Sequence, residues 1–252
     1  MDQGRFSVFP HENFVDLFLV QFGWEQCESL YSYGPHVRNN YLFHYIISGK
    51  GHLEVRQRDG SVRTYPLRAG QGFLICPNQV TTYCADEKDP WAYTWVEFGG
   101  VQAQYRLTLA GLGEDQPVYT PIQPDMSQPV RDELLFIANH AQFSSLKLMA
   151  HFYLFLDALI DSSSSKQRVR GLSQQGFYIR EAIHFIDQYY RDDIRIEQIA
   201  SFCGLNRTYF SRLFKEVMGQ TPQEYLARYR VNKAMELMRN TNMSIGEVAS
   251  MV

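Results

Sequence analysis

Hydrophobic and polar positions alternate with a period of two over much of the stretch from about residue 41 to residue 100. The run YLFHYIISGKGHLEV alternates, breaks at Gly49-Lys50-Gly51 and resumes, and GFLIC and WAYTWVEF are further strand-like runs. Asp59-Gly60 stands between two such runs and is a hairpin signal, and Pro77-Asn78 marks another turn. Many short strands separated by turns predict a small antiparallel barrel or jelly roll.

The period changes to a helical one from about residue 128. Two apolar stretches follow, and the second, at 146–160, is apolar around much of its circumference. Such a helix requires burial, either against the barrel or against another subunit. A polar, serine-rich segment, DSSSSKQRVR, then resembles a linker. The sequence predicts an α+β protein with a barrel at 1–127, a helical dimerisation segment at 128–161, a linker at 162–175 and a helical module at 176–252.

The most informative segment of that module reads GLNRTYFSRLFKEVMG, residues 204–219. Phe210, Leu213, Phe214 and Val217 form one apolar stripe at helical spacing. Short polar and cationic side chains lie away from this stripe, namely Arg207, Thr208, Ser211, Arg212 and Lys215. A short apolar-faced helix precedes the glycine, and two short helices joined by a glycine turn make a helix-turn-helix. Its second helix offers cations and hydroxyls to a major groove of double-stranded DNA.

An internal repeat adds to this interpretation. IEQIASFC at 196–203 resembles IGEVASMV at 245–252, at a constant offset of 49 residues. Between them, the capping box at 221–224 predicts the start of a long helix to about Arg239, with Leu237 and Met238 among its inward positions. The second unit thus starts like the first, and the sequence stops before a second turn and recognition helix. We expect DNA binding by these residues alone to be weak and poorly specific.

Composition excludes only a few classes of protein. The chain has 252 residues, 45% of them hydrophobic, and contains no apolar run long enough to span a membrane. The N-terminal segment lacks the features of a signal peptide, so we expect a cytoplasmic protein. Its four cysteines are scattered without a CxxC motif and are expected to be buried thiols.

Charge is distributed unevenly between the two halves. Residues 166–252 hold 13 of the 24 lysines and arginines and 9 of the 27 aspartates and glutamates, a net charge of +4. Residues 1–165 hold the rest, a net charge of −7. This asymmetry indicates a cationic module that meets an anion and an acidic module that does not.

An enzyme has little support in the residue pattern. His36, His44 and His52 are spaced eight residues apart and form no HxH pair, so we expect no metal site, no cofactor and no catalytic residues. The alternative for these histidines is a structural or ligand-contacting role. No Ser-His-Asp, Cys-His or paired-carboxylate arrangement can be singled out.

The C-terminal motifs together resemble the DNA-binding module of the AraC/XylS family of transcriptional regulators. The matching segments are IEQIASFCGL, YFSRLFKEVMGQTPQEYL, the helix with Arg230 and Ala234, and SIGEVASMV. YLFHYIISGKGHLEV, LRAGQGFLICPNQ and WAYTWVEF resemble the family's cupin-like sensing barrel more loosely. The sequence around Gly34-Pro35-His36-Val37-Arg38 resembles that of Gram-positive regulators of oligosaccharide uptake, such as raffinose or multiple-sugar regulators.

The resemblance implies a DNA-binding regulator that is controlled by a small carbohydrate, and a homodimer that pairs two DNA modules. It implies that Thr208, Ser211 and Arg212 face base edges, while Arg207 and Lys215 contact phosphates. Arg195 departs from the family's Ser or Thr before the first helix, which predicts a poorer cap.

The resemblance also implies a sugar pocket, which needs aromatic faces and planar polar groups. The expected ligand-binding residues are Arg38, Tyr83, Tyr93 and Trp95, with His36 and Tyr41 as weaker candidates. Tyr93 and Trp95 are two residues apart and point to the same side of a strand. The alternative is that both are aromatic residues of the hydrophobic core and do not bind a ligand. A non-sugar effector and a barrel enzyme with an added helical domain remain the rival functions.

Overall fold

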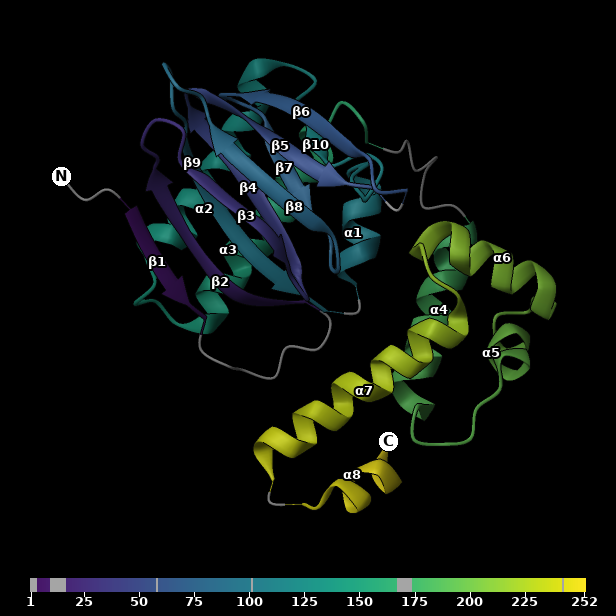
Figure 1. Cartoon of the computed structure of the whole chain (residues 1–252). Coiled ribbons are helices and arrows are strands. Elements are labelled where there is room, and N and C mark those ends of the chain that lie inside the picture. The colour runs from purple at the N-terminus through teal and green to yellow at the C-terminus, as the bar shows by residue number, and fades with distance from the viewer. Residues whose placement is uncertain (1–3, 10–16, 58, 101, 167–173, 242) are drawn as a thin grey trace. The chain divides into compact units, whose positions relative to one another are not determined.

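The computed structural model describes residues 4–9, 17–57, 59–100, 102–166, 174–241 and 243–252. For residues 174–177, 180 and 240 it describes the backbone but not the side chain. The chain divides into two compact units (Figure 1). The first comprises the described residues from 4 to 166, and the second comprises those from 174 to 252.

The first unit is built from antiparallel strands followed by helices. Its strands are β1 (Gly4–Val8), β2 (Phe18–Gln26), β3 (Ser32–Val37), β4 (Tyr41–Ser48), β5 (Lys50–Arg56), β6 (Val62–Arg68), β7 (Gly72–Ile75), β8 (Val80–Ala85), β9 (Ala92–Gly99) and β10 (Val118–Tyr119). Its helices are α1 (Ala103–Leu109), the 3-10 turn η1 (Pro124–Ser127), α2 (Gln128–Asn139) and α3 (Ser145–Ser162).

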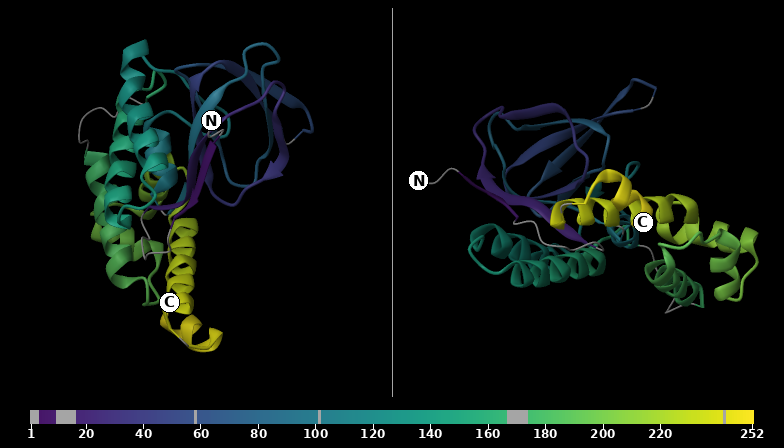
Figure 2. Two further views of the ribbon diagram at one scale, coloured as in Figure 1. Left: turned by 90° about the vertical axis from the view of Figure 1, so that its left-hand side faces the viewer. Right: turned by 90° about the horizontal axis from the view of Figure 1, so that it is seen from below.

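Two sheets face each other in this unit. One has the order β1-β2-β9-β4-β7-β10 and the other the order β3-β8-β5-β6. Helices α2 and α3 pack on the outer face of the larger sheet, as Figure 2 shows. The central strands β4 and β9 therefore bury both faces, one toward the smaller sheet and one toward the helices, which explains their nearly continuous burial.

Side-chain alternation assigns each residue of β4 to one of these two faces. Phe43 packs on Phe155 of α3 with ring centroids 5.4 Å apart, and Tyr45 donates a hydrogen bond to Ser127 Oγ at 2.9 Å. Leu42 belongs instead to the cluster between the sheets. Tyr41 stacks on Phe98, which in turn contacts Phe152 of α3, so Tyr41 lies on the helix side.

The second unit is helical. Its elements are α4 (Gln174–Tyr189), α5 (Ile196–Phe202), α6 (Arg207–Met218), α7 (Pro222–Asn240) and α8 (Ile245–Met251). The Arg230 guanidinium fixes α7 to the turn after α4, because its Nε donates to Tyr190 O at 2.8 Å and its Nη2 donates to Asp192 O at 2.7 Å. Tyr229 adds a hydrogen bond to Asp187 of α4.

The turn between α5 and α6 depends on a left-handed glycine. Gly204 has φ +69°, a conformation that other residues adopt only with strain. Leu205 N donates to Ala200 O at 2.9 Å, which closes the end of α5. Asn206 then caps α6, since its side chain accepts from Tyr209 N at 2.9 Å. This is the predicted helix-turn-helix geometry.

The α+β architecture with a cupin-like antiparallel barrel and a C-terminal helix-turn-helix is confirmed. Three features differ from the expectation. Strands β1, β2 and β3 lie before residue 41, where the predicted strands begin, and helix α1 follows β9 where the pattern predicts no helix. Met238 is exposed, because the C-terminal half of α7 extends beyond the helices α4 and α6 that bury its first half.

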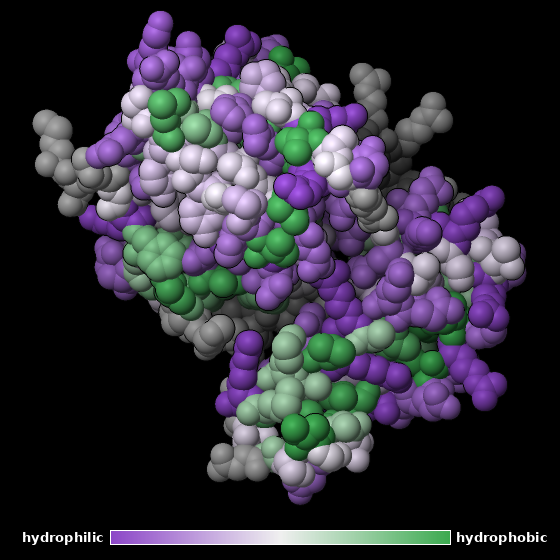
Figure 3. Space-filling view, in the orientation of Figure 1, coloured by the Kyte–Doolittle hydropathy of each residue, from purple (hydrophilic) through white to green (hydrophobic). Residues whose placement is uncertain are grey.

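The C-terminal part of this unit exposes apolar side chains. Figure 3 shows hydrophobic surface over α7 and α8, where the exposed residues are Val231, Met235, Met238 and Ile245. Helix α8 starts at Ile245 and α5 starts at Ile196, so the 49-residue repeat corresponds to two helices that begin at equivalent residues.

Candidate functional site

A cavity of about 200 Å³ lies between the two sheets of the first unit. This volume is below the range of roughly 300–1,000 Å³ that is usual for sites enclosing drug-sized ligands, so it suits a compact ligand. Four of the predicted ligand-binding residues line it together, namely Arg38, Tyr83, Tyr93 and Trp95.

Aromatic rings form most of the wall. Tyr93 and Trp95 lie on the same side of β9 with ring centroids 5.7 Å apart. Tyr83 stacks on Tyr33 at 5.4 Å. Trp95 lies over Gly23 of the neighbouring strand, where an added Cβ would come within 2.8 Å of the indole. The strand pairing of a glycine with a tryptophan thus makes room for the flat ring beside the cavity.

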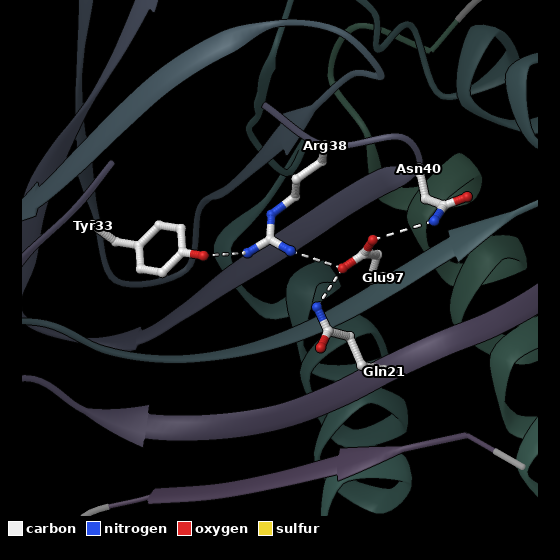
Figure 4. Close-up of polar contacts among 5 residues, drawn as sticks. All are labelled: Gln21, Tyr33, Arg38, Asn40 and Glu97. Atoms are coloured by element: carbon white, nitrogen blue, oxygen red, sulfur yellow. Dashed lines mark hydrogen bonds and ion pairs between the residues drawn. The ribbon is translucent and has the colours of Figure 1, made fainter. Parts of the chain in front are cut away.

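The polar part of the site centres on Arg38. Its Nη1 donates to Glu97 Oε2 at 2.8 Å and its Nη2 donates to Tyr33 OH at 3.4 Å (Figure 4). Gln21 and Asn40 also donate to the Glu97 carboxylate. A guanidinium that is largely buried needs a partner, and Glu97 supplies it.

Two predicted pocket residues lie elsewhere. His36 is exposed and contacts the Tyr33 ring edge-on at 5.6 Å, beyond a register shift in the pairing of β3 with β8. Tyr41 faces the helices, because it lies an odd number of residues from the cavity-lining Leu42 and His44. Neither residue lines the cavity.

Sequence reasoning missed several residues that line the cavity. They are Phe6, Gln21, Glu25, Tyr31, Tyr33 and Leu42, and His44 had been considered only as a metal or ligand-contacting candidate. Most of them precede or flank the stretch from which strands were predicted. A period-two pattern applied to FLVQFGWEQ would have placed Gln21 and Glu25 on one face of β2.

Two titrating side chains in the cavity are held neutral. Burial lowers the pKa of His44 well below its ordinary value, and the positive charge of Arg38 acts in the same direction. Burial is also the main cause that raises the pKa of Tyr93, whose hydroxyl donates to Glu25 Oε2 at 2.9 Å. Within the described parts of the chain, the structure shows no group of three or more side chains arranged to hold a metal ion.

The second candidate site is the outer face of α6. Phe210, Leu213 and Phe214 are buried, so the opposite face of the helix is presented outward. That face carries the five predicted DNA contacts, of which Ser211 is half-buried and Arg207, Thr208, Arg212 and Lys215 are exposed. Arg207 pairs with Glu197 of α5 at 2.7 Å, and the Arg212 guanidinium lies over the Tyr209 ring at 5.6 Å from its centroid.

An antiparallel barrel of two facing sheets with a lined cavity, followed by a helix-turn-helix, is the architecture of a DNA-binding regulator with a ligand-binding domain. Residues 18–156 match the model of the AraC-like ligand binding domain, and residues 199–252 match that of a helix-turn-helix domain. The chain belongs to the AraC/XylS family of transcriptional regulators. It is a regulator and not an enzyme.

Several named regulators resemble the chain over nearly its whole length. The Msm operon regulatory protein of Streptococcus mutans is 28% identical over 98% of this chain and 87% of its own length. The raffinose operon transcriptional regulatory protein RafR of Pediococcus pentosaceus is 27% identical over 99% and 89%. The lactose operon transcription activator of Staphylococcus xylosus is 22% identical over 94% and 84%. No helix among the described residues is long and apolar enough to cross a membrane.

Proposed function

We propose that this regulator is a cytoplasmic activator of sugar uptake or metabolism genes and that a small carbohydrate bound in the barrel controls it. The observation that carries this proposal is the cavity itself, in which an arginine lies among aromatic rings that pack on one another, some stacked and some edge-to-face. Aromatic faces suit the apolar faces of sugar rings, and a planar guanidinium suits pairs of hydroxyls. The names of relatives, which refer to raffinose and lactose operons, point in the same direction.

The test is a thermal-shift screen against a panel of mono- and oligosaccharides, followed by calorimetric titration of the best ligand. Trp95→Ala and Arg38→Ala should each weaken its binding by about tenfold or more, since each removes a main contact surface. Arg63→Ala is the matched control, because Arg63 is exposed on β6 and does not line the cavity. Undiminished affinity in both cavity variants would show that the sugar does not bind in this cavity. A screen in which only non-sugars bind would show that the effector is not a sugar.

For the DNA interface we propose that Thr208, Ser211 and Arg212 meet base edges and that Arg207 and Lys215 meet phosphates. All five lie on the outer face of α6, and the Arg212 guanidinium projects from the middle of the helix. A bidentate arginine–guanine contact contributes roughly 1–3 kcal/mol of discrimination. Arg207 is held by Glu197 in the free protein, so phosphate binding has to compete with that pair.

Arg212→Ala should therefore weaken binding to the operator by about tenfold while changing binding to a scrambled duplex far less. Lys215→Ala should weaken binding to both duplexes by similar factors, because a phosphate contact carries no sequence information. Gel-shift titrations at one fixed salt concentration measure both effects. Equal losses on the two duplexes for Arg212→Ala would exclude a base-reading role.

A homodimer completes the proposal. Leu146, Tyr153 and Leu154 are exposed on α3, on the side turned away from the sheet. An exposed apolar helix face of this kind is typical of a subunit contact. Sedimentation equilibrium at micromolar concentration tests it, and a monomer there would contradict it.

A further inference from the structure

The carboxylate of Glu97 is buried next to the cavity and is surrounded by donors. Only 8% of its side chain is exposed. It accepts hydrogen bonds from Arg38 Nη1 at 2.8 Å, from Asn40 Nδ2 at 3.3 Å and from Gln21 Nε2 (Figure 4). Three donors from three different parts of the chain hold this carboxylate in one position.

The consequence for Arg38 is that its charge is already paired. A guanidinium has five N–H donors in a fixed fork, and the described contacts with Glu97 and Tyr33 use two of them. Donors therefore remain for the oxygens of a ligand. An incoming anion, however, meets an ion pair instead of an isolated positive charge, and the attraction to Arg38 is opposed by repulsion from Glu97.

A second carboxylate lines the cavity directly. Glu25 lies on β2, and its Oε2 accepts from Tyr93 OH at 2.9 Å. Among the described residues that line the cavity, Arg38 is the one cationic side chain, because His44 is neutral. The cavity and its immediate surroundings thus combine one positive charge with two negative charges, so an anionic ligand is disfavoured while hydroxyl groups still find donors and acceptors.

We infer that the effector is a polyhydroxyl compound without a negative charge and that Glu97 is the residue that excludes phosphorylated and carboxylated sugars. This inference rests on the proposed sugar-binding function and names its chemical class. Glu97 acts through Arg38: it positions the guanidinium and cancels its charge, and it does not itself line the cavity.

The test compares matched ligands that differ in charge. Galactose and glucose are titrated by calorimetry beside their uronic acids and 6-phosphates. The wild-type protein should bind a neutral sugar at least about tenfold more tightly than its anionic derivatives. In Glu97→Gln that ratio should fall about tenfold or more, because the uronate gains affinity for the unpaired guanidinium.

Two further variants show whether the gain comes from Arg38. In the double variant Arg38→Gln with Glu97→Gln, the gain for the uronate should disappear. Glu87→Gln changes the same charge at an exposed position away from the cavity, and it should leave every ratio unchanged. If Glu97→Gln does not melt cooperatively, Glu97→Asp serves in its place, since its shorter side chain draws the carboxylate away from the Arg38 guanidinium, and it should lower the ratio by a smaller factor.

The outcomes separate this inference from the function on which it rests. Equal wild-type affinity for a sugar and its uronate, or an unchanged ratio in Glu97→Gln, overturns the inference while leaving a sugar site in place. If no sugar binds the wild type, the proposed function fails. Titration with sulfate then tests separately whether Glu97 excludes anions from the cavity. Sulfate that stabilises Glu97→Gln but not the wild type supports anion exclusion, and the absence of that difference refutes it.

Discussion

His44 is a buried imidazole with an unusual position for a polar side chain. Its exposed fraction is 1%, and its Nδ1 has no hydrogen-bond partner among the described residues. The ring stacks on Phe73 at 4.5 Å and lies against Tyr83 and Tyr93. An unpaired buried polar atom costs roughly 1–3 kcal/mol, and a ligand hydroxyl that bonds this nitrogen removes that cost.

His44→Phe keeps the stacked ring and removes the unpaired nitrogen. Because the pKa of folded His44 is lowered, the unfolded chain binds a proton that the folded chain does not when the pH falls below about 6.5. The free energy of unfolding of the wild type should therefore decrease as the pH is lowered from about 7 to about 5, and His44→Phe should lose that part of the decrease. Urea unfolding at both pH values measures it. Exposed His36→Phe is the control, and identical pH profiles for wild type and His44→Phe would contradict the prediction.

Individual residues show what a sequence can and cannot reveal about the cavity. Tyr93 and Trp95 were placed on one face by their spacing alone, and they do share the cavity wall. Tyr41 was expected there too, but its odd separation from His44 puts it on the helix side of a strand that is buried on both faces. Glu97 escaped prediction because a lone glutamate in a strand gives no signal until the fold brings Arg38 against it.

Helix capping distinguishes the elements of the second unit. The side chains of Asn206, Thr221 and Ser244 cap α6, α7 and α8 by accepting a backbone N–H of the first turn. Helix α5 lacks this acceptor, because its N-cap is Arg195. The Gln198 side chain compensates in part by accepting from Arg195 N at 2.7 Å. The poorer cap expected from the sequence is therefore a real feature of α5.

Replacing this arginine should stabilise the second unit. Arg195→Ser supplies the missing acceptor and completes a capping box with Gln198, with an expected gain of about 0.5–1 kcal/mol in the free energy of unfolding. Helical circular dichroism during urea unfolding of the full chain measures this gain. Arg191→Ser is the control, since it removes an exposed arginine outside the helix start. A gain of equal size in both variants would trace the effect to charge instead of capping.

Element boundaries were predictable where local chemistry marks them. The capping box at 221–224 predicted the start of α7, the 49-residue repeat predicted α8, and the glycine turn predicted the break between α5 and α6. Strands β1 to β3 lie before residue 41 and were not predicted. Strand β2 pairs with β9 and strand β3 pairs with β8, each more than forty residues away along the chain, and β1 pairs with β2.

At the scale of the whole molecule, ligand control requires that the sugar bind two states of the protein with different affinity. The cavity belongs to the first unit and the recognition helix to the second. Thermodynamic linkage then demands reciprocity: the factor by which sugar changes operator affinity equals the factor by which operator changes sugar affinity. Couplings of this kind typically correspond to roughly 5–150-fold.

Arg38→Ala should reduce the sugar response without weakening the DNA module. Its operator affinity in the absence of sugar should match that of the wild type, because Arg38 lies in the first unit, while the effect on operator affinity of sugar at the wild-type Kd should nearly vanish, because the weakened site stays mostly empty at that concentration. Gel-shift titrations with and without the neutral sugar found by screening give one factor, and calorimetry with and without operator gives the other. Arg63→Ala should retain both factors, since Arg63 is exposed and lies outside the cavity. A sugar response that persists in Arg38→Ala places the effector at another site, and a wild type that binds sugar with both factors equal to one shows that this cavity does not control DNA binding.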